Sequence, residues 1–255
     1  MWGQPPSAVR RARLGSGVHH LECFTDNRLP AATISAFTED SLDPHVRGYL
    51  HTPETPNNEA LILTHGAGSN AQAPLLMAVS EAFAEAGYTV LRCDLPYRQS
   101  RSYGPPGPGD AARDREGLKN AIAAMKKQNS GRIFLGGHSY GGRQSSMLCA
   151  EEPDLVAGLV LLSYPLHPPR KPTQLRTQHL PSLRTPILFI QGTRDPFGSI
   201  AELEQALKVI PAKTKLLTIE GAGHDLGFKG KAKVGSLTTT ILTAFEEFLS
   251  RAHSA

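Results

Sequence analysis

One serine stands in a setting that would make it a nucleophile. Ser139 is the centre of Gly137-His-Ser-Tyr-Gly141, between a short apolar run and residues compatible with a helix. A sharp turn from a strand into a helix holds a serine on strained backbone, so that its hydroxyl projects above the sheet. Glycines two positions to either side remove side chains that would collide at such a turn. The spacing therefore predicts a nucleophilic serine at this turn.

A serine hydroxyl of this kind needs a base, and the sequence places one histidine suitably. In the chain order typical of such sites, the acid and the histidine both follow the serine. Only His224 and His253 lie beyond the last candidate acid loop, and His253 is close to the chain end, where fraying is expected. His224 lies in the glycine-rich turn 221–226, directly after a predicted strand. It is the predicted general base.

The acid that orients this histidine is predicted by position. The carboxylates between the serine and the histidine are Glu151, Glu152, Asp154, Asp195, Glu202, Glu204 and Glu220. Most of them fall on helices or at helix ends, whereas Asp195 directly follows a predicted strand, at the edge where parallel sheets gather their ligands. An aspartate that only stabilises the turn before Pro196 is the alternative. The position of Asp195 between Ser139 and His224 in the chain order favours its role as the third member of a triad.

The same reasoning predicts an oxyanion hole and a set of substrate contacts. One N–H group comes from Tyr140, the residue after the nucleophile, and the other from the loop after the strand Ala60–Thr64, with Ala67 first and Gly68 second. Asp94 and Arg98 either line the pocket floor or form a structural pair. The candidates for substrate contacts are His65, Asp94, Arg98, His138, Tyr164 and His167.

The elements that must position these residues alternate between strands and helices. Strands are predicted at Ala60–Thr64, Tyr88–Cys93, the run before Ser139, Ala157–Ser163, Pro186–Gln191 and Lys215–Ile219. Helices are predicted at Pro74–Ala86, from a capping Asp110 to Gln128, Gly142–Ala150, Ile200–Val209 and Val234–Arg251. This alternation predicts an α/β fold with a mostly parallel sheet covered on both faces. A hairpin of Ala31–Phe37 and Val46–Leu50 adds an antiparallel edge.

Length and composition predict one domain. The chain has 255 residues, of which 40% are hydrophobic, and shows no internal repeat. We expect a loosely ordered segment 1–30, in which Val18–Phe24 is a candidate edge strand, followed by a single domain over 31–255. The proline-rich segment 164–185 is too short for a lid of several helices and is predicted to be a minimal cap.

Charge, hydropathy and cysteine content indicate which partners and which cellular compartment to expect. The net charge is +4, with no block of Lys and Arg interleaved with aromatic residues, so nucleic acid is not expected as a partner. No apolar run approaches the roughly 18 residues of a membrane span. Cys23, Cys93 and Cys149 are few and widely spaced, as is typical of reduced thiols in a cytoplasmic protein. The oligomeric state is left open.

Six stretches together carry a family resemblance. They are Val46–Pro53, Thr64–Gly68, Gly136–Gly142, Ser163–Pro168, Gly192–Asp195 and Gly221–His224. In them the chain resembles α/β-hydrolases, specifically the small dienelactone-hydrolase-like branch with its animal testis-expressed and chromatin-complex-associated relatives. The resemblance implies an α/β-hydrolase fold, with some relatives serving as scaffolds. Dienelactone hydrolases proper use a cysteine nucleophile where this chain has Ser139, so their substrate is not carried over.

The residues favour a serine hydrolase that forms an acyl-enzyme with a small soluble ester, thioester or similar acyl substrate and needs no cofactor or metal. A non-catalytic interaction protein and an acyltransferase are the alternatives; the complete triad favours catalysis over the first. The stretch Gly66–Ala71 also matches a dinucleotide-binding pattern. However, the next helix is predicted to begin only at Pro74, and Asp94 lies farther along the chain than the usual ~20 residues, which disfavours that reading.

Overall fold

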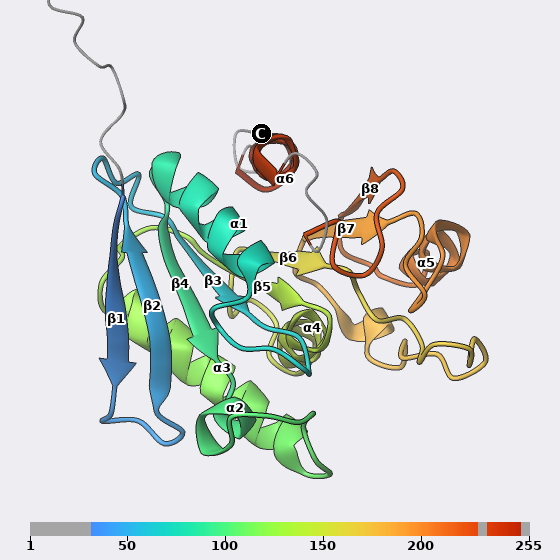
Figure 1. Ribbon diagram of the computed structural model, residues 1–255, viewed down its shortest axis with the longest axis horizontal. Helices are drawn as coiled ribbons and strands as arrows, with labels where there is room; N and C mark the ends of the chain where they lie inside the picture. The colour runs from blue at the N-terminus through green and yellow to red at the C-terminus, as the bar shows by residue number, and fades with distance from the viewer. Residues whose placement is uncertain (1–31, 229–233, 251–255) are drawn as a thin grey trace, which may run out of the picture.

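A computed structural model describes residues 32–228 and 234–250, which form one eight-stranded sheet with helices on both faces (Figure 1). The strands are β1 (Thr33–Glu39), β2 (Val46–Thr52), β3 (Ala60–Thr64), β4 (Thr89–Asp94), β5 (Ile133–His138), β6 (Gly158–Leu162), β7 (Ile187–Gly192) and β8 (Thr214–Ile219). The helices are α1 (Pro74–Glu85), α2 (Pro96–Ser100), α3 (Asp110–Lys126), α4 (Tyr140–Glu151), α5 (Ile200–Leu207) and α6 (Val234–Phe245), with a 3₁₀ turn η1 (Leu180–Ser182) and a π turn η2 (Glu246–Ser250). The predicted segment 1–30, with its candidate strand Val18–Phe24, lies outside the described residues.

The strand order confirms the predicted fold class. The order is β1-β2-β4-β3-β5-β6-β7-β8. β1 pairs antiparallel with β2, and β2 antiparallel with β4, whereas every neighbouring pair from β4 to β8 is parallel. The carboxyl ends of the parallel strands therefore meet at one edge of the sheet, where the predicted site residues follow β3, β5, β7 and β8.

The central strands are buried on both faces, which explains their uninterrupted apolar sequences. In β3, Ala60 and Ile62 pack into the core beneath α3 and α4, while Leu61 and Leu63 pack into the core beneath α1 and α6. Figure 1 shows these two helix layers on opposite sides of the sheet. Two cores of this kind hold the strand ends in fixed positions, so that the loops beyond them start from a rigid frame.

One local prediction differs from the structure, and one short helix was not predicted. Asp110 is the first residue of α3 and not its cap, because Gly109 occupies the cap position with φ 92°. The Asp110 carboxylate instead accepts a hydrogen bond from the Gly107 N–H and pairs with Arg101. The short helix α2 was not predicted, because five residues carry no periodicity. The α-helix α6 ends at Phe245 and the π turn η2 follows it directly to Ser250, while the predicted end at Arg251 lies outside the described residues.

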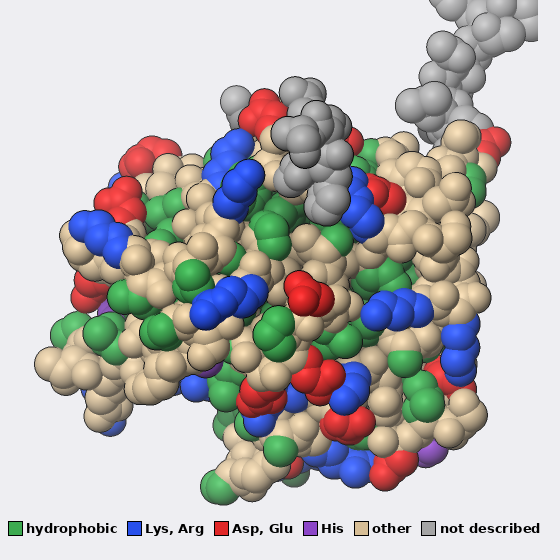
Figure 2. Space-filling model, turned by 180° about the vertical axis from the view of Figure 1, so that it is seen from behind, with side chains coloured by type: hydrophobic (Ala, Val, Ile, Leu, Met, Phe, Trp, Pro, Cys, Tyr) green, Lys and Arg blue, Asp and Glu red, His purple; other side chains and the backbone are tan. Residues whose placement is uncertain are grey.

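The described helices include none with the length and apolar character to cross a membrane. Cys93 and Cys149 are buried free thiols, and burial raises the pKa of each to about 12. On the face seen in Figure 2, basic and acidic side chains are interleaved over the surface.

Candidate active site

Ser139 lies between β5 and α4 in a strained conformation. Its φ is 52° and its ψ is −114°, in a region that non-glycine residues rarely adopt. The Ser139 N–H donates to the Leu162 carbonyl at 2.8 Å, which anchors the turn to β6. A Cβ atom at Gly137 would lie 2.6 Å from the Thr64 oxygen, and one at Gly141 would lie 2.6 Å from the His65 oxygen. Both glycines are therefore required by the close approach of this turn to β3.

Three side chains from three loops form a continuous hydrogen-bonded chain. The Nε2 atom of His224 lies 2.8 Å from the Ser139 hydroxyl oxygen. On the other side of the ring, Nδ1 lies 2.8 Å from Oδ2 of Asp195. The second oxygen of Asp195 accepts the Phe197 N–H at 2.9 Å, and the carboxylate side chain is fully buried. This arrangement fixes the tautomer with a proton on Nδ1, leaving Nε2 free to accept one from the serine.

Two rings that pack against His224 restrict its orientation. Phe197 stacks on the imidazole with ring centroids 4.1 Å apart and an interplanar angle of 29°. His138 donates from Nε2 to the His224 carbonyl at 2.7 Å. Burial lowers the pKa of His138 to about 4, so this ring is neutral near pH 7. The sequence analysis did not single out Phe197, although its place two residues after Asp195 is a signal that could have found it.

A cavity of about 870 Å³ opens beside Ser139. That volume lies within the range of small-molecule sites. All three predicted oxyanion residues, Ala67, Gly68 and Tyr140, line it, as do Ser139, His224 and His138. The other lining residues are Gly66, Ser69, Ala73, Pro74, Leu75, Pro105, Pro106, Arg143, Pro165, Arg176, Pro196, Phe197, Asp225 and Phe228. A Cβ at Gly68 would meet no atom within 4 Å, so a side chain there would have open space before it.

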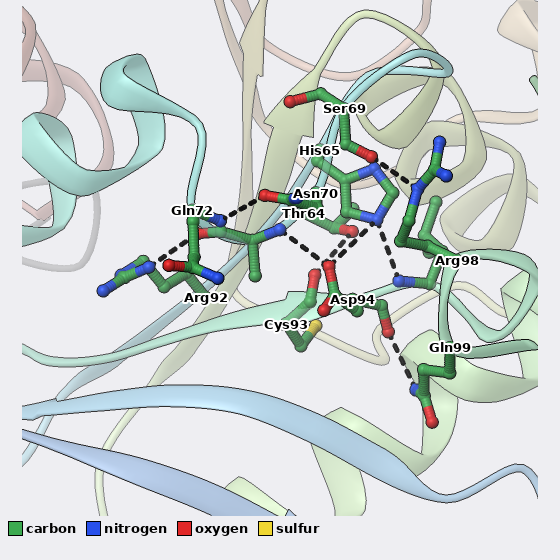
Figure 3. Close-up of polar contacts among 12 residues, drawn as sticks. Thr64, His65, Ser69, Asn70, Gln72, Arg92, Cys93, Asp94, Arg98 and Gln99 are labelled. Atoms are coloured by element: carbon green, nitrogen blue, oxygen red, sulfur yellow. Dashed lines mark hydrogen bonds and ion pairs between the residues drawn. The ribbon is translucent and has the colours of Figure 1, made fainter. Parts of the chain in front are cut away.

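The loop after β3 is held by polar side chains of β4 and α2 (Figure 3). Asp94 accepts the Ala71 N–H at 2.7 Å, and Arg92 donates to the Ala71 carbonyl at 2.6 Å. Arg98 donates from Nε to the Ser69 carbonyl at 2.7 Å and from Nη2 to the Gly104 carbonyl at 2.7 Å. The backbone of residues 67–71 is thereby fixed by side chains that do not line the cavity.

Most of the residues predicted to contact substrate do not line this cavity. Only His138 lines the cavity; His65, Asp94, Arg98, Tyr164 and His167 do not. His65 is fully buried, donates from Nδ1 to the Gly66 carbonyl and accepts the Leu95 N–H at Nε2. Tyr164 donates to the Arg176 carbonyl, and His167 bonds to the Pro168 carbonyl. Their polar atoms bind backbone, because strand-end position predicts nearness to a site but not the direction of a side chain.

Tyr140 is held by a contact that the sequence did not reveal. Its hydroxyl donates to Oδ2 of Asp114 at 2.7 Å, and Oδ1 of the same carboxylate accepts the Tyr97 N–H at 3.1 Å. Asp114 is fully buried in α3, and burial raises the pKa of its carboxyl. The side chain that follows the nucleophile is thus anchored to the helix layer below the sheet.

The fold and the positions of Ser139, Asp195 and His224 at the ends of its strands are typical of one class of protein. A parallel sheet with a serine on the turn after β5, a carboxylate after β7 and a histidine after β8 is the architecture of the α/β-hydrolases. A family described as "Alpha/beta hydrolase domain" matches residues 57–250 of the chain. The chain belongs to this family.

Solved structures and curated relatives place it beside dienelactone-hydrolase-like proteins. Dienelactone hydrolase from Anabaena variabilis superposes with a TM-score of 0.67 and 22% identity, covering 86% of this chain and 100% of that one. An α/β serine hydrolase without a lid from Xanthomonas campestris gives 0.68 and 18%, covering 88% and 98%. A putative carboxymethylenebutenolidase of Escherichia coli K12 is 29% identical over 114 residues, which are 40% of this chain and 41% of the relative. The chain thus spans less than half of the length of the curated relatives it matches.

Proposed function

We propose that the protein is a serine hydrolase that cleaves an ester, thioester or similar acyl bond of a small substrate. The observation that carries this proposal is the hydrogen-bonded chain from the Ser139 hydroxyl through His224 to Asp195, with 2.8 Å at each link, at the wall of an open cavity. A non-catalytic protein has no need of this strained serine, which costs about 1–3 kcal/mol of backbone strain.

In the proposed mechanism, each of the three hydrogen-bonded residues has its own role. Ser139 Oγ attacks the substrate carbonyl carbon while its proton passes to Nε2 of His224. The carbonyl oxygen becomes an oxyanion, which the N–H groups of Tyr140 and of Ala67, or of Gly68 as the second choice, stabilise. Asp195 balances the imidazolium charge.

The attack forms a tetrahedral intermediate. When this intermediate collapses, the alcohol or thiol leaves with the proton from His224, and the acyl group stays on Ser139. Water repeats the sequence on the acyl-enzyme: His224 accepts its proton, and the carboxylic acid leaves as Ser139 regains its hydrogen.

The substrate class follows from the cavity and the relatives. Within the cap segment 164–185, the only helical element in the structure is the three-residue turn η1, so nothing there forms a lipase-type lid. A dienelactone is a cyclic ester, and the relatives named for such substrates support ester chemistry. We therefore expect short, soluble esters to be better substrates than long-chain lipids.

Labelling with a fluorophosphonate tests the proposal. The adduct resembles the tetrahedral intermediate, so the groups that serve catalysis also favour the label. We expect one label per chain, on Ser139, with none on Ser139→Ala and labelling slowed by about 10²-fold or more in His224→Ala. If the folded wild-type protein resists labelling for hours at neutral pH, the interaction-protein alternative replaces the proposal.

A further inference from the structure

The two donors of the proposed oxyanion hole come from different loops. The Tyr140 N–H belongs to the first residue of α4, and the Ala67 N–H belongs to the loop after β3. Because both must point at one substrate oxygen, the spacing between the two loops determines how well the hole fits an oxyanion. A main-chain hydrogen bond joins them directly, from the Gly141 N–H to the His65 carbonyl at 3.1 Å. A second connection between the two loops runs through side chains.

Tyr97 holds the β3 end of this second connection. Its hydroxyl donates to the Ala67 carbonyl at 2.8 Å and lies 3.3 Å from the Gly66 carbonyl. These two carbonyls belong to the peptide groups that carry the candidate N–H groups of Gly68 and Ala67. The C=O and N–H of a trans peptide point in opposite directions in one plane, so a bond that holds the carbonyl also directs the N–H. Tyr97 therefore fixes the donor on this side, whichever of the two residues supplies it.

Asp114 joins Tyr97 to Tyr140. One carboxyl oxygen accepts the Tyr97 N–H at 3.1 Å, and the other accepts the Tyr140 hydroxyl at 2.7 Å. The two tyrosine rings also pack edge to face, with centroids 5.9 Å apart and an interplanar angle of 90°. α3 can bring Asp114 to this position because Gly117, one turn later, lies against Pro96 at the start of α2. A Cβ atom at Gly117 would be 2.5 Å from the Pro96 ring.

The setting of Asp114 distinguishes it from a residue that only fills the core. Asp114 is fully buried and makes no ion pair in the part of the chain that the structure describes. Burial raises the pKa of its carboxyl, whereas the bonds from Tyr140 and Tyr97 lower it. Burying a carboxylate without a cation is unfavourable, so a residue that only filled this space would be apolar. Because neither Asp114 nor Tyr97 lines the cavity, any effect of the carboxyl on the reaction is indirect.

We propose that Asp114 is a positioning residue that sets the spacing of the two oxyanion donors, through Tyr140 on one side and Tyr97 on the other. The inference rests on the proposed hydrolase function and adds a residue that controls its transition state. Without the carboxyl group, the two tyrosines lose their shared anchor, and the N–H groups can move apart. A displaced donor weakens the contact with the oxyanion more than it weakens binding of the uncharged substrate.

The kinetic test compares two substitutions of Asp114. Asp114→Leu removes both bonds at similar size, whereas Asp114→Asn keeps an oxygen for the Tyr97 N–H and an amide that can donate to the Tyr140 hydroxyl. For 4-nitrophenyl butyrate we expect kcat to fall about 10²-fold in Asp114→Leu with KM little changed, and less than about 10-fold in Asp114→Asn. Asn120→Leu is the matched control, because Asn120 is a buried polar residue of the same helix that bonds the Pro44 carbonyl. Its loss should leave kcat unchanged.

A tetrahedral analogue separates positioning from loss of folded protein. With butylboronic acid, the Ser139 oxygen bonds to boron and its proton passes to His224, so that the adduct places an oxygen in the oxyanion hole. We expect the inhibition constant to rise about 10²-fold in Asp114→Leu, in parallel with the fall in kcat, and to stay at the wild-type value in Asn120→Leu. If Asp114→Leu only reduced the folded fraction, kcat would fall while the inhibition constant stayed the same. That result would overturn the positioning role.

A double-variant cycle tests whether Asp114 acts through Tyr140. Tyr140→Phe keeps the ring and removes only the hydroxyl, and we expect it to lower kcat about 10-fold, less than Asp114→Leu, because Tyr97 remains anchored. In the Asp114→Leu protein the same change should have no further effect, since the bond that it removes is already absent. Losses that multiply would overturn the proposal. If Asp114→Leu does not fold, a wild-type kcat and inhibition constant in Tyr140→Phe would overturn it equally.

Fluorophosphonate labelling keeps this inference distinct from the proposed function. We expect Asp114→Leu to be labelled about 10²-fold more slowly than the wild-type protein, because the phosphonyl oxygen uses the same donors. Labelling of both proteins at the same rate would overturn the positioning role and leave the hydrolase proposal intact. If the wild-type protein is neither labelled nor able to hydrolyse 4-nitrophenyl butyrate, the hydrolase proposal fails, and the role of Asp114 fails with it.

Discussion

The loops on the two sides of Ser139 are held by different kinds of contact. On the β3 side, Arg98 and Asp94 bind backbone atoms of residues 67–71 and keep their own side chains out of the cavity. On the β7 and β8 side, the main contacts join side chains to each other, from Asp195 to His224 and from Phe197 to the same ring. The first side fixes a stretch of main chain, and the second fixes one imidazole.

The difference follows from what each side is proposed to supply. An oxyanion hole consists of backbone N–H groups, so its precision depends on contacts to the backbone. A proton relay consists of side-chain atoms, so its precision depends on side-chain rotamers. Polar residues buried under a loop can therefore be essential to a site without touching its substrate. Substitutions on the two sides should therefore have different effects on the reaction rate.

The largest effect is expected at the carboxylate of the relay. Asp195→Asn keeps the size of the side chain but favours the wrong histidine tautomer, since the amide can donate toward Nδ1. We expect kcat for a short 4-nitrophenyl ester to fall by about 10⁴-fold, with KM little changed. Steady-state kinetics on the variant, with circular dichroism to verify the fold, measure this. A loss below 10-fold would mean that another group orients His224.

A smaller effect is expected from the backbone support. Arg98→Lys retains the charge but loses the fork that reaches the Ser69 and Gly104 carbonyls. We expect kcat/KM and the rate of fluorophosphonate labelling to fall together by about 10²-fold, the cost of a displacement near 1 Å. Lys171→Arg, on the exposed surface of the cap segment, serves as a control. Retention of both rates would show that the 67–71 loop holds its shape without Arg98.

A few-fold effect is expected from the ring that stacks on His224. Phe197→Leu keeps apolar bulk but removes the π face, which lies 4.1 Å from the imidazole. Because the imidazolium forms during the reaction, loss of a cation–π contact worth about 0.5–1 kcal/mol should lower kcat about 2-fold to 5-fold. Pre-steady-state measurement of acylation isolates that step. An unchanged acylation rate would limit Phe197 to lining the cavity.

The β3 side should also respond to acid through its support in β2 and β4. His51 accepts a hydrogen bond from Arg92, which holds the Ala71 carbonyl, and burial followed by the Arg92 charge lowers the pKa of His51 from 6.5 to about 4. Between these two pH values the unfolded chain binds a proton that the folded protein excludes. The associated stability is therefore present above about pH 6.5 and declines as the pH falls toward 4.

This pH dependence is measurable by urea unfolding at pH 7.5 and pH 5.0. We expect the midpoint to be lower at the acid pH, and His51→Gln to reduce the difference, because the amide can still accept from Arg92 but does not titrate. The difference should not vanish, since burial lowers the pKa values of His138 and His179 in the same direction. An undiminished difference in the variant would exclude His51 as a source.

The fold, and the three residues of the proposed relay that lie together in the structure, could be predicted from the sequence for a physical reason. Short apolar runs bounded by turn residues favour strands buried on both faces. The glycines around Ser139 are required because the backbone of β3 approaches too closely for a side chain. Chain order then selected Asp195 and His224, and the structure places the three in contact. These features depend on local sequence and on the sheet alone.

The sequence did not show the direction of individual side chains or which distant segments of the chain meet. Arg98 follows β4 at the correct edge, yet it turns inward to carbonyl groups, and its position gave no sign of this. Arg176 lines the cavity because the cap segment returns to α4, where His179 forms a hydrogen bond with Ser146. The position of Arg143 at the cavity could have been predicted, because residues four apart on a helix share a face and Arg143 is four residues after Ser139.

The short cap has a further consequence for the fate of the covalent intermediate. The imidazole of His224 keeps 21% of its surface exposed, beside a cavity that no helical lid covers in the described cap segment. An acyl-enzyme formed there would meet bulk solvent directly, whereas sites that transfer acyl groups must keep water away from the reactive intermediate. Any other acceptor would have to bind in the cavity to compete. For the proposed mechanism, an open entrance thus favours hydrolysis over acyl transfer.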